Sequence, residues 1–182
     1  MKILAIAATN SRNSINRTLV THAAERLARG HEGAEIVHVD LNDYEMPIYS
    51  VDREGADGVP QPAQDLRARI GEADAVLIAF AEHNGTVTAA WKNVFDWMSR
   101  LEGTVWQERP VLMLSATPGP RAGANVLAGQ ELVAPFFGAD LRGVQGFGNW
   151  GETWDAEAGA LKSEEDRAAL DALLDKLAPV AA

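Results

Sequence analysis

The stretch "ADAVLIAFAEHNGT", residues 73–86, decides the fold, because a hydrophobic run meets a polar break within it. Its first eight residues are almost all apolar. Continuous apolar runs of this length are typical of a strand that is buried on both faces of a sheet. Glu82, His83, Asn84 and Gly85 follow, and all of them are polar or flexible. Such residues directly after a core strand indicate a loop that is available for function.

Apolar runs of the same kind recur along the chain and are separated by helical patterns. They predict strands at residues 2–8, 34–41, 73–80, 109–117 and 139–147. Apolar residues spaced three or four apart predict helices after Ser14, after Pro62, over 86–102, over 124–133 and from Ser163. The remaining long segment, residues 42–62, reads as irregular and is therefore a candidate for function.

Alternating strands and helices predict a parallel sheet with helices on both faces, because parallel strands need crossover connections. With five strands, we expect an α/β, flavodoxin-like three-layer sandwich: a five-stranded parallel sheet in the order 2-1-3-4-5. No repeat or linker divides the 182 residues, so we expect one domain over residues 1–182. Ligands of such sheets bind at the carboxyl ends of the strands, near the point where the strand order reverses.

Composition and charge exclude several classes of function. The formal net charge of -10 argues against nucleic acid as a partner, since nucleic-acid-binding proteins carry basic patches. The chain has no cysteine, which excludes disulfides, zinc–thiolate sites and catalytic thiols and fits a cytoplasmic protein. The first apolar run is too short to span a membrane and lacks the profile of a cleaved signal, so we expect no membrane association.

The loop after the first predicted strand, residues 8–16, is rich in side chains that donate hydrogen bonds. Its hydroxyl and amide donors are Thr9, Asn10, Ser11, Ser14 and Asn16. The loop opens a helix, whose first N–H groups lack internal partners and attract anions, so a phosphate is the natural ligand. Arg12 adds a possible charged contact. The alternative is that Ser14 is only a helix cap and that the other residues form an ordinary turn.

Two more loops leave the same edge of the predicted sheet. In residues 81–86, Gly85 allows the backbone to approach a flat ligand closely. Glu82 and His83 are candidates for proton transfer, with a solvated Glu82 and a packed His83 as the alternative. In residues 116–125, prolines and glycines indicate a rigid wall with backbone N–H groups near its end.

Three motifs of the chain resemble those of one known family. The first loop, "ATNSRNSIN", is similar to G-S-x-R-x-x-S-x-N, although Ala8 replaces the glycine and Arg12 comes one residue late. Residues 81–86, "AEHNGT", resemble P-E-Y-N-G-S, with His83 where tyrosine is usual. The helix that follows contains "KNVFDW", which matches K-N-x-x-D-W, and "EMPIYS" at 45–50 resembles L-P-x-Y.

These motifs are those of the NAD(P)H-dependent FMN reductase family, flavodoxin-like proteins that include quinone, chromate and azo-dye reductases. The resemblance implies that FMN is the cofactor and that the three loops bind it. The residues implied are Thr9, Ser11, Arg12, Ser14, Ile15 and Asn16 at the phosphate, Glu82, His83, Asn84 and Gly85 along the ring, and Ser115, Thr117, Gly119 and Gly123 on its other side.

The implied activity is that of an FMN-dependent oxidoreductase. NADH or NADPH would give a hydride to the FMN, and a small-molecule acceptor such as a quinone, a metal or another flavin would then take the electrons. No catalytic side chain is required. A flavodoxin-like electron carrier without efficient NAD(P)H turnover is the alternative. A phospho-receiver domain is set aside, because Thr9–Asn10 and Glu82–His83 stand where its acidic residues would be.

The predicted helix over 86–102 has an unusually wide apolar surface. Phe95 and Trp97 lie about 100° to either side of its main apolar stripe. A helix that is apolar on more than one face is generally buried on more than one face. We expect a homodimer or a dimer of dimers through this helix, which the family resemblance also suggests. A thick contact within the chain is the alternative.

Overall fold

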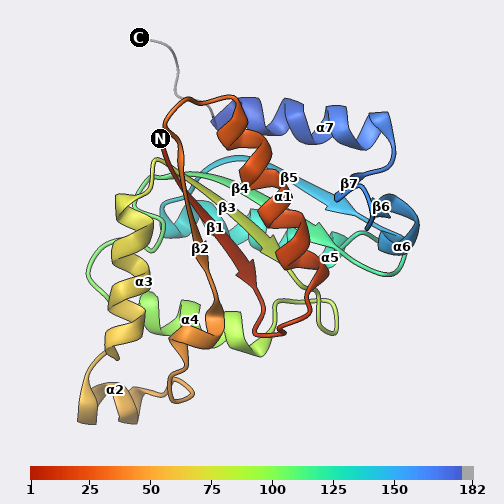
Figure 1. Ribbon diagram of the computed structural model, residues 1–182. Coiled ribbons are helices and arrows are strands. Elements are labelled where there is room, and N and C mark those ends of the chain that lie inside the picture. Colours follow the sequence, from red (N-terminus) through yellow and green to blue (C-terminus); the bar gives the residue numbers. More distant parts are fainter. Residues whose placement is uncertain (178–182) are drawn as a thin grey trace.

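The computed structural model describes residues 1–177, and a five-stranded parallel sheet forms its centre (Figure 1). The strand order is β2-β1-β3-β4-β5 and all neighbouring pairs are parallel, which confirms the predicted flavodoxin-like sandwich. The strands are β1 (Lys2–Ala8), β2 (Glu35–Val39), β3 (Ala75–Phe80), β4 (Pro110–Ala116) and β5 (Asp140–Phe147). All five predicted strands are present, and β2 is shorter at both ends than predicted.

Helices cover both faces of the sheet (Figure 1). On one face lie α1 (Ile15–Arg29) and α7 (Glu164–Leu174), and on the other lie α3 (Gln61–Glu72), α4 (Ala89–Met98) and α5 (Ala124–Val133). Alternate residues of β1 point to opposite faces: Ile3 packs on the α1 side, and Leu4 packs on the α4 side. Among residues 1–177, no helix is both long enough and apolar enough to cross a membrane.

The structure differs from the prediction in several local elements. Residues 42–62 contain α2 (Val51–Asp57), which begins after Ser50 and follows the 3-10 turn η1 (Leu41–Tyr44). None of the residues of α2 is buried, so it has no apolar stripe that periodicity could detect. The helix predicted over 86–102 covers only Ala89–Met98, because Thr88 caps its start.

Several short elements were also not indicated by the sequence pattern. The 3-10 turn η2 (Ala134–Phe137) lies between α5 and β5, and after β5 come α6 (Trp150–Thr153), the hairpin strands β6 (Trp154–Asp155) and β7 (Ala160–Leu161), and the 3-10 turn η3 (Asp175–Leu177). Each is only two to four residues long. Elements of this length are too short to carry a helical or strand period.

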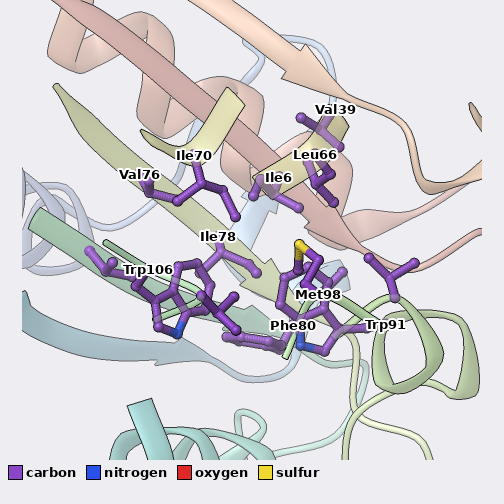
Figure 2. Packing of buried hydrophobic residues seen from close by; sticks show 14 of the residues in the cluster. Ile6, Val39, Leu66, Ile70, Val76, Ile78, Phe80, Trp91, Met98 and Trp106 are labelled. Carbon is purple, nitrogen blue, oxygen red and sulfur yellow. The ribbon is translucent and has the colours of Figure 1, made fainter. Parts of the chain in front are cut away.

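Three aromatic rings pack together among aliphatic side chains in the core between the sheet and α4 (Figure 2). The indole of Trp91 stacks on Trp106, with ring centroids 6.0 Å apart, and meets Phe80 edge-on at 5.9 Å. All three side chains are almost completely buried. Trp91 thus joins α4 to the end of β3, next to the polar loop at 81–86.

The two apolar flanks of α4 are covered by the chain itself. Phe95 packs edge-on against Phe137, with ring centroids 4.9 Å apart. On the other flank, Trp97 donates a hydrogen bond from Nε1 to the carbonyl of Pro47 at 2.7 Å and packs edge-on against Tyr49. The wide apolar surface of this helix is therefore used within the chain, as the alternative interpretation predicted.

A buried imidazole lies on the opposite face of the molecule. His22, on α1, is only 6% exposed, and its ring meets Trp154 edge-on with centroids 5.2 Å apart. Trp154 in turn stacks on Trp150 at 5.0 Å. Burial lowers the pKa of His22, and the positive charges of Arg26 and Arg29 lower it further. The folded protein therefore holds this imidazole in its neutral form.

We predict that this histidine makes the fold sensitive to acid. In the unfolded chain His22 takes up a proton near pH 6.5, whereas in the folded chain it does so only at lower pH. The contribution of His22 to stability should therefore be constant above about pH 6.5 and be lost as the pH drops below it, by about 1.4 kcal/mol per unit of pKa difference. Urea unfolding of wild type and His22→Gln between pH 5 and 8 measures this.

The Gln variant should lose this part of the pH dependence. The matched control is His38→Gln, which changes an exposed histidine on β2 and should keep the wild-type profile. Parallel pH profiles for wild type and His22→Gln would contradict the assignment.

Candidate functional site

The three predicted loops lie together at the carboxyl edge of the sheet (Figure 1). They follow β1, β3 and β4, which are adjacent strands, and Ala8 at the end of β1 is paired with Phe80 at the end of β3. The edge between β1 and β3 is also where the strand order reverses. The structure thus brings residues 8–16, 81–86 and 116–125 to one place.

The floor of this site consists of buried hydroxyls that cap the strand ends. Thr88 donates a hydrogen bond from Oγ1 to the carbonyl of Ala8 at 3.0 Å, and its side chain also caps α4. Ser115 donates from Oγ to the carbonyl of Phe80 at 2.8 Å. Both hydroxyls are buried, and each bonds to the carbonyl of the last residue of a strand. Ser115 was predicted to contact the ligand, but its side chain lies beneath the site and holds two strands together.

The side chain of Asn16 pairs with the backbone at the end of the third strand, β4. Its Nδ2 donates to the carbonyl of Ala116 at 2.9 Å, and its Oδ1 accepts the N–H of the same residue at 2.7 Å. The side chain is 2% exposed. Asn16 was predicted as a phosphate donor, yet both polar ends of its amide are engaged with β4. Through its side chain, Asn16 joins the first loop to the third.

In the first loop, the donors divide into engaged and exposed groups. The hydroxyl of Ser14 accepts the N–H groups of Asn16 and Arg17, so Ser14 is the cap of α1, as the alternative interpretation held. Thr9 is buried, and its Oγ1 accepts the N–H of Ser11 at 3.2 Å. The side chains of Asn10, Ser11 and Arg12 are exposed, and Ile15 is half-buried at the start of the helix. Asn10, Ser11 and Arg12 are therefore the side chains of this loop that are accessible to a ligand near the N-terminus of α1.

The N-terminus of α1 also differs electrostatically from that of α7. The first turn of α1 contains no acidic residue, whereas that of α7 contains Glu164, Glu165 and Asp166. Because acidic side chains neutralise the positive end of a helix, the first turn of α7 is neutralised and that of α1 is not. An anion is therefore favoured at α1.

The second loop is a tight turn. The backbones of His83 and Thr86 bond to each other in both directions, at 2.9 and 3.1 Å. Asn84 and Gly85 at its tip have φ values of 54° and 78°, as in the type I′ turn that Asn-Gly favours. His83 and Asn84 are exposed, so His83 does not pack as the alternative interpretation proposed. The turn presents its tip to the site.

The third loop is braced from behind. The hydroxyl of Thr117 bonds to the carbonyl of Gly119, and that carbonyl also accepts the N–H of Asn149 at 3.0 Å. The carbonyl of Thr117 accepts the N–H of Trp150 at 3.1 Å. Gly119 has open space around it, whereas Gly123 is closely packed. These bonds hold the third loop in place next to the Asn-Gly turn, which its Asn125 contacts at Gly85.

Two contacts across the site were not predicted. The carboxylate of Glu82 accepts the N–H of Val126, in the first turn of α5, at 3.0 Å. The side chain of Asn125 lies against Gly85, because a Cβ on this glycine would come within 3.4 Å of its Nδ2. Glu82 thus bonds to the start of α5, directly after the third loop, so one of its carboxylate oxygens is engaged within the chain and is not solvated. The partners are about 40 residues apart, so no local pattern indicates the pair.

A cavity of about 450 Å³ lies beside the first loop, between α4 and the segment that follows β2. Its lining includes Asn10, Tyr44, Met46 and Asn93. The Nδ2 of Asn93 donates to the carbonyls of Met46 and Pro47. The "KNVFDW" and "EMPIYS" motifs are therefore in direct contact, and the former holds the latter in place.

A doubly wound sheet with donor-rich loops at its switch point defines a class: α/β proteins whose ligand sites lie at the carboxyl ends of the strands. The family model for NADPH-dependent FMN reductase matches residues 1–143. This is most of the chain, and the protein belongs to that family.

Individual relatives agree with this assignment. The chain is 33% identical over 119 residues to "Probable NADPH:quinone oxidoreductase 2" of Oryza sativa subsp. japonica, covering 65% of this chain and 57% of the relative. It is 32% identical to "NAD(P)H:quinone oxidoreductase" of Solanum tuberosum over the same share of this chain and 60% of the relative. The matches thus span somewhat less than two thirds of each plant protein.

The fold has close counterparts among solved structures. FerB, described as a flavoenzyme NAD(P)H:(acceptor) oxidoreductase from Paracoccus denitrificans, superimposes with a TM-score of 0.73 over 97% of this chain and 96% of its own. The sequence identity is 24%, so this likeness concerns the fold.

We predict that Asn16 contributes to stability even without a ligand. Asn16→Asp keeps an acceptor for the N–H of Ala116 but sets a carboxylate oxygen against its carbonyl. The lost hydrogen bond and the unpaired carbonyl should lower the free energy of unfolding by about 1–3 kcal/mol. Urea denaturation of the flavin-free protein measures it, with Asn13→Asp, an exposed change in the same loop, as the control. A loss below about 0.5 kcal/mol would contradict the prediction.

Proposed function

We propose that the protein is an FMN-dependent NAD(P)H oxidoreductase that reduces small-molecule acceptors of the quinone, metal or flavin type. The observation that carries the proposal is the meeting of three donor-rich loops at the switch point, with a helix N-terminus free of acidic residues. Family membership and the names of the plant relatives support it.

The residues of the site fit the two ends of FMN. Ser11, Arg12 and the backbone at the start of α1 would hold the phosphate, because they combine exposed donors with the positive end of a helix. Asn84 and Gly85 would lie along one side of the flavin ring, where glycine lets the backbone approach. Thr117 and Gly119 would form the other side.

Bound FMN would supply the redox chemistry, accepting a hydride from NADH or NADPH and passing the electrons to the acceptor. The chain would bind and orient the cofactor and exclude water from one face of its ring. Backbone N–H groups of the third loop are suited to stabilise negative charge on the reduced cofactor. His83 is exposed at the turn, where it could meet a substrate, but the reaction does not require its proton.

We predict that the purified protein binds FMN and oxidises NADH or NADPH when a quinone is added. Titration of flavin-free protein with FMN, followed by steady-state kinetics, measures both. Arg12→Ala should weaken FMN binding several-fold, since it removes a charged contact to the phosphate. Arg29→Ala, an exposed change at the far end of α1, is the control.

The two results separate the proposal from its alternative. Tight FMN binding without NAD(P)H turnover would identify an electron carrier, a function that the net charge of -10 also suits. Failure to bind FMN at all would contradict both functions.

We also propose that residues 1–182 form one FMN-binding domain, that the protein is cytoplasmic, and that it assembles as a homodimer or a dimer of dimers beside α4. Because Phe95 and Trp97 pack within the chain, support for assembly comes from neighbouring side chains. Ile48 and Val51 are 75% and 74% exposed. They lie on the segment that Asn93 and Trp97 hold against α4. Exposed apolar side chains on a fixed segment are typical of an interface.

We predict that Ile48→Asp converts the assembly to a monomer, because burying an unpaired carboxylate at an interface costs several kcal/mol. Sedimentation velocity of wild type and variant measures this. Leu132→Asp is the control, since Leu132 is also 70% exposed but lies on α5. A monomeric wild type, or a dimer that Ile48→Asp leaves intact, would contradict this interface.

A further inference from the structure

The start of α5 lacks the side-chain cap that helices normally have. Its N-cap is Gly123, with φ of 70°, and no side chain of its own can bond to the first turn. A Cβ at this position would lie 2.1 Å from Oγ of Ser115, which is itself bonded to the carbonyl of Phe80. Serine, threonine, aspartate and asparagine, the usual N-caps, therefore do not fit here. Because Ser115 occupies the space beside Gly123, residue 123 cannot carry a side chain that caps α5.

Glu82 supplies the missing cap from another loop. Its Oε2 accepts the N–H of Val126, the third residue of α5, at 3.0 Å. This is the N–H that an N-cap side chain would normally take. The carboxylate also lies at the positive end of the helix, where a negative charge is favoured. Glu82 thus does for α5 what Ser14 does for α1 from within its own loop.

The bond links the two sides of the proposed flavin site. Glu82 comes directly before the His83–Thr86 turn, whereas Val126 follows the wall that ends at Gly123. The second contact across the site, Asn125 against Gly85, runs in parallel with it. Of the two, the Glu82 bond is the directional one, with a fixed donor and acceptor.

We propose that Glu82 is a positioning residue: its carboxylate fixes the Asn-Gly turn relative to the start of α5 and so sets the relative position of the second and third loops. The role of these loops in binding a flavin rests on the proposed function. The clamp itself rests on the Glu82–Val126 bond and on the exclusion of a cap at Gly123. A carboxylate engaged in this way orients the two loops relative to each other.

The test compares Glu82→Ala with Glu82→Gln, because a glutamine carbonyl oxygen can accept the same N–H. In flavin-free protein, hydrogen exchange at the amide of Val126 should become roughly tenfold faster in the Ala variant, the loss expected for one bond to a charged group. The dissociation constant for FMN should rise by a similar factor. In the Gln variant both quantities should stay close to wild type.

Glu164→Ala is the matched control, because it removes a carboxylate from the first turn of α7, far from the site. It should leave the exchange of Val126 and the affinity for FMN unchanged.

Each outcome decides a separate point. Unchanged exchange at Val126 in Glu82→Ala would overturn the clamp. Faster exchange with unchanged FMN affinity would overturn the positioning role, and a Gln variant that behaves like the Ala variant would do the same. If wild type does not bind FMN, the proposed function fails, whereas the exchange of Val126 still shows whether the clamp exists.

Discussion

The carboxyl edge of the sheet depends on pairing the last backbone groups of three buried strands. Ala8, Phe80 and Ala116 end β1, β3 and β4, and each is at most 2% exposed. A carbonyl left unpaired in such a place costs about 1–3 kcal/mol. Side chains of neighbouring elements remove this cost: Thr88 at the start of α4 for β1, Ser115 on β4 for β3, and Asn16 in the first turn of α1 for β4. Because each partner comes from a different segment, capping the strands also fixes the loops relative to one another.

This constraint explains why polar residues gather where the core strands end. One group of polar side chains is buried and forms hydrogen bonds with the backbone at the strand ends, and the other group is exposed to solvent. Of the five buried polar residues in the described part of the chain, three are the strand caps Asn16, Thr88 and Ser115. Ser11, Arg12 and Asn84 are exposed on the same loops. A rigid floor of engaged groups beneath exposed donors is what a preorganised binding site requires.

The fold and the meeting of the three loops at one edge of the sheet could be predicted from the sequence, whereas the contacts of individual polar residues could not. Apolar runs and helical stripes are local signals, and the parallel topology follows from their order. Whether Asn16 points outward or toward Ala116, however, depends on a residue 100 positions away. The same holds for Glu82 and Val126, and for Trp97 and Pro47. The helix α2 was not predicted because none of its residues is buried, so its sequence carries no apolar stripe.

The charge distribution shows how an acidic chain can offer a site to an anion. A net charge of -10 repels a phosphate at long range, but salt screens such repulsion over about 10 Å. Within that distance, the charges and dipoles of nearby groups determine whether an anion is attracted or repelled. Glu82 neutralises the first turn of α5, and three acidic residues do so at α7, while the first turn of α1 has none and lies beside Arg12. Since α5 and α1 both begin at the same edge of the sheet, this difference in charge favours an anion at α1 over α5. In the proposed flavin site, Glu82 would therefore also favour one direction of the nucleotide, with its phosphate at α1.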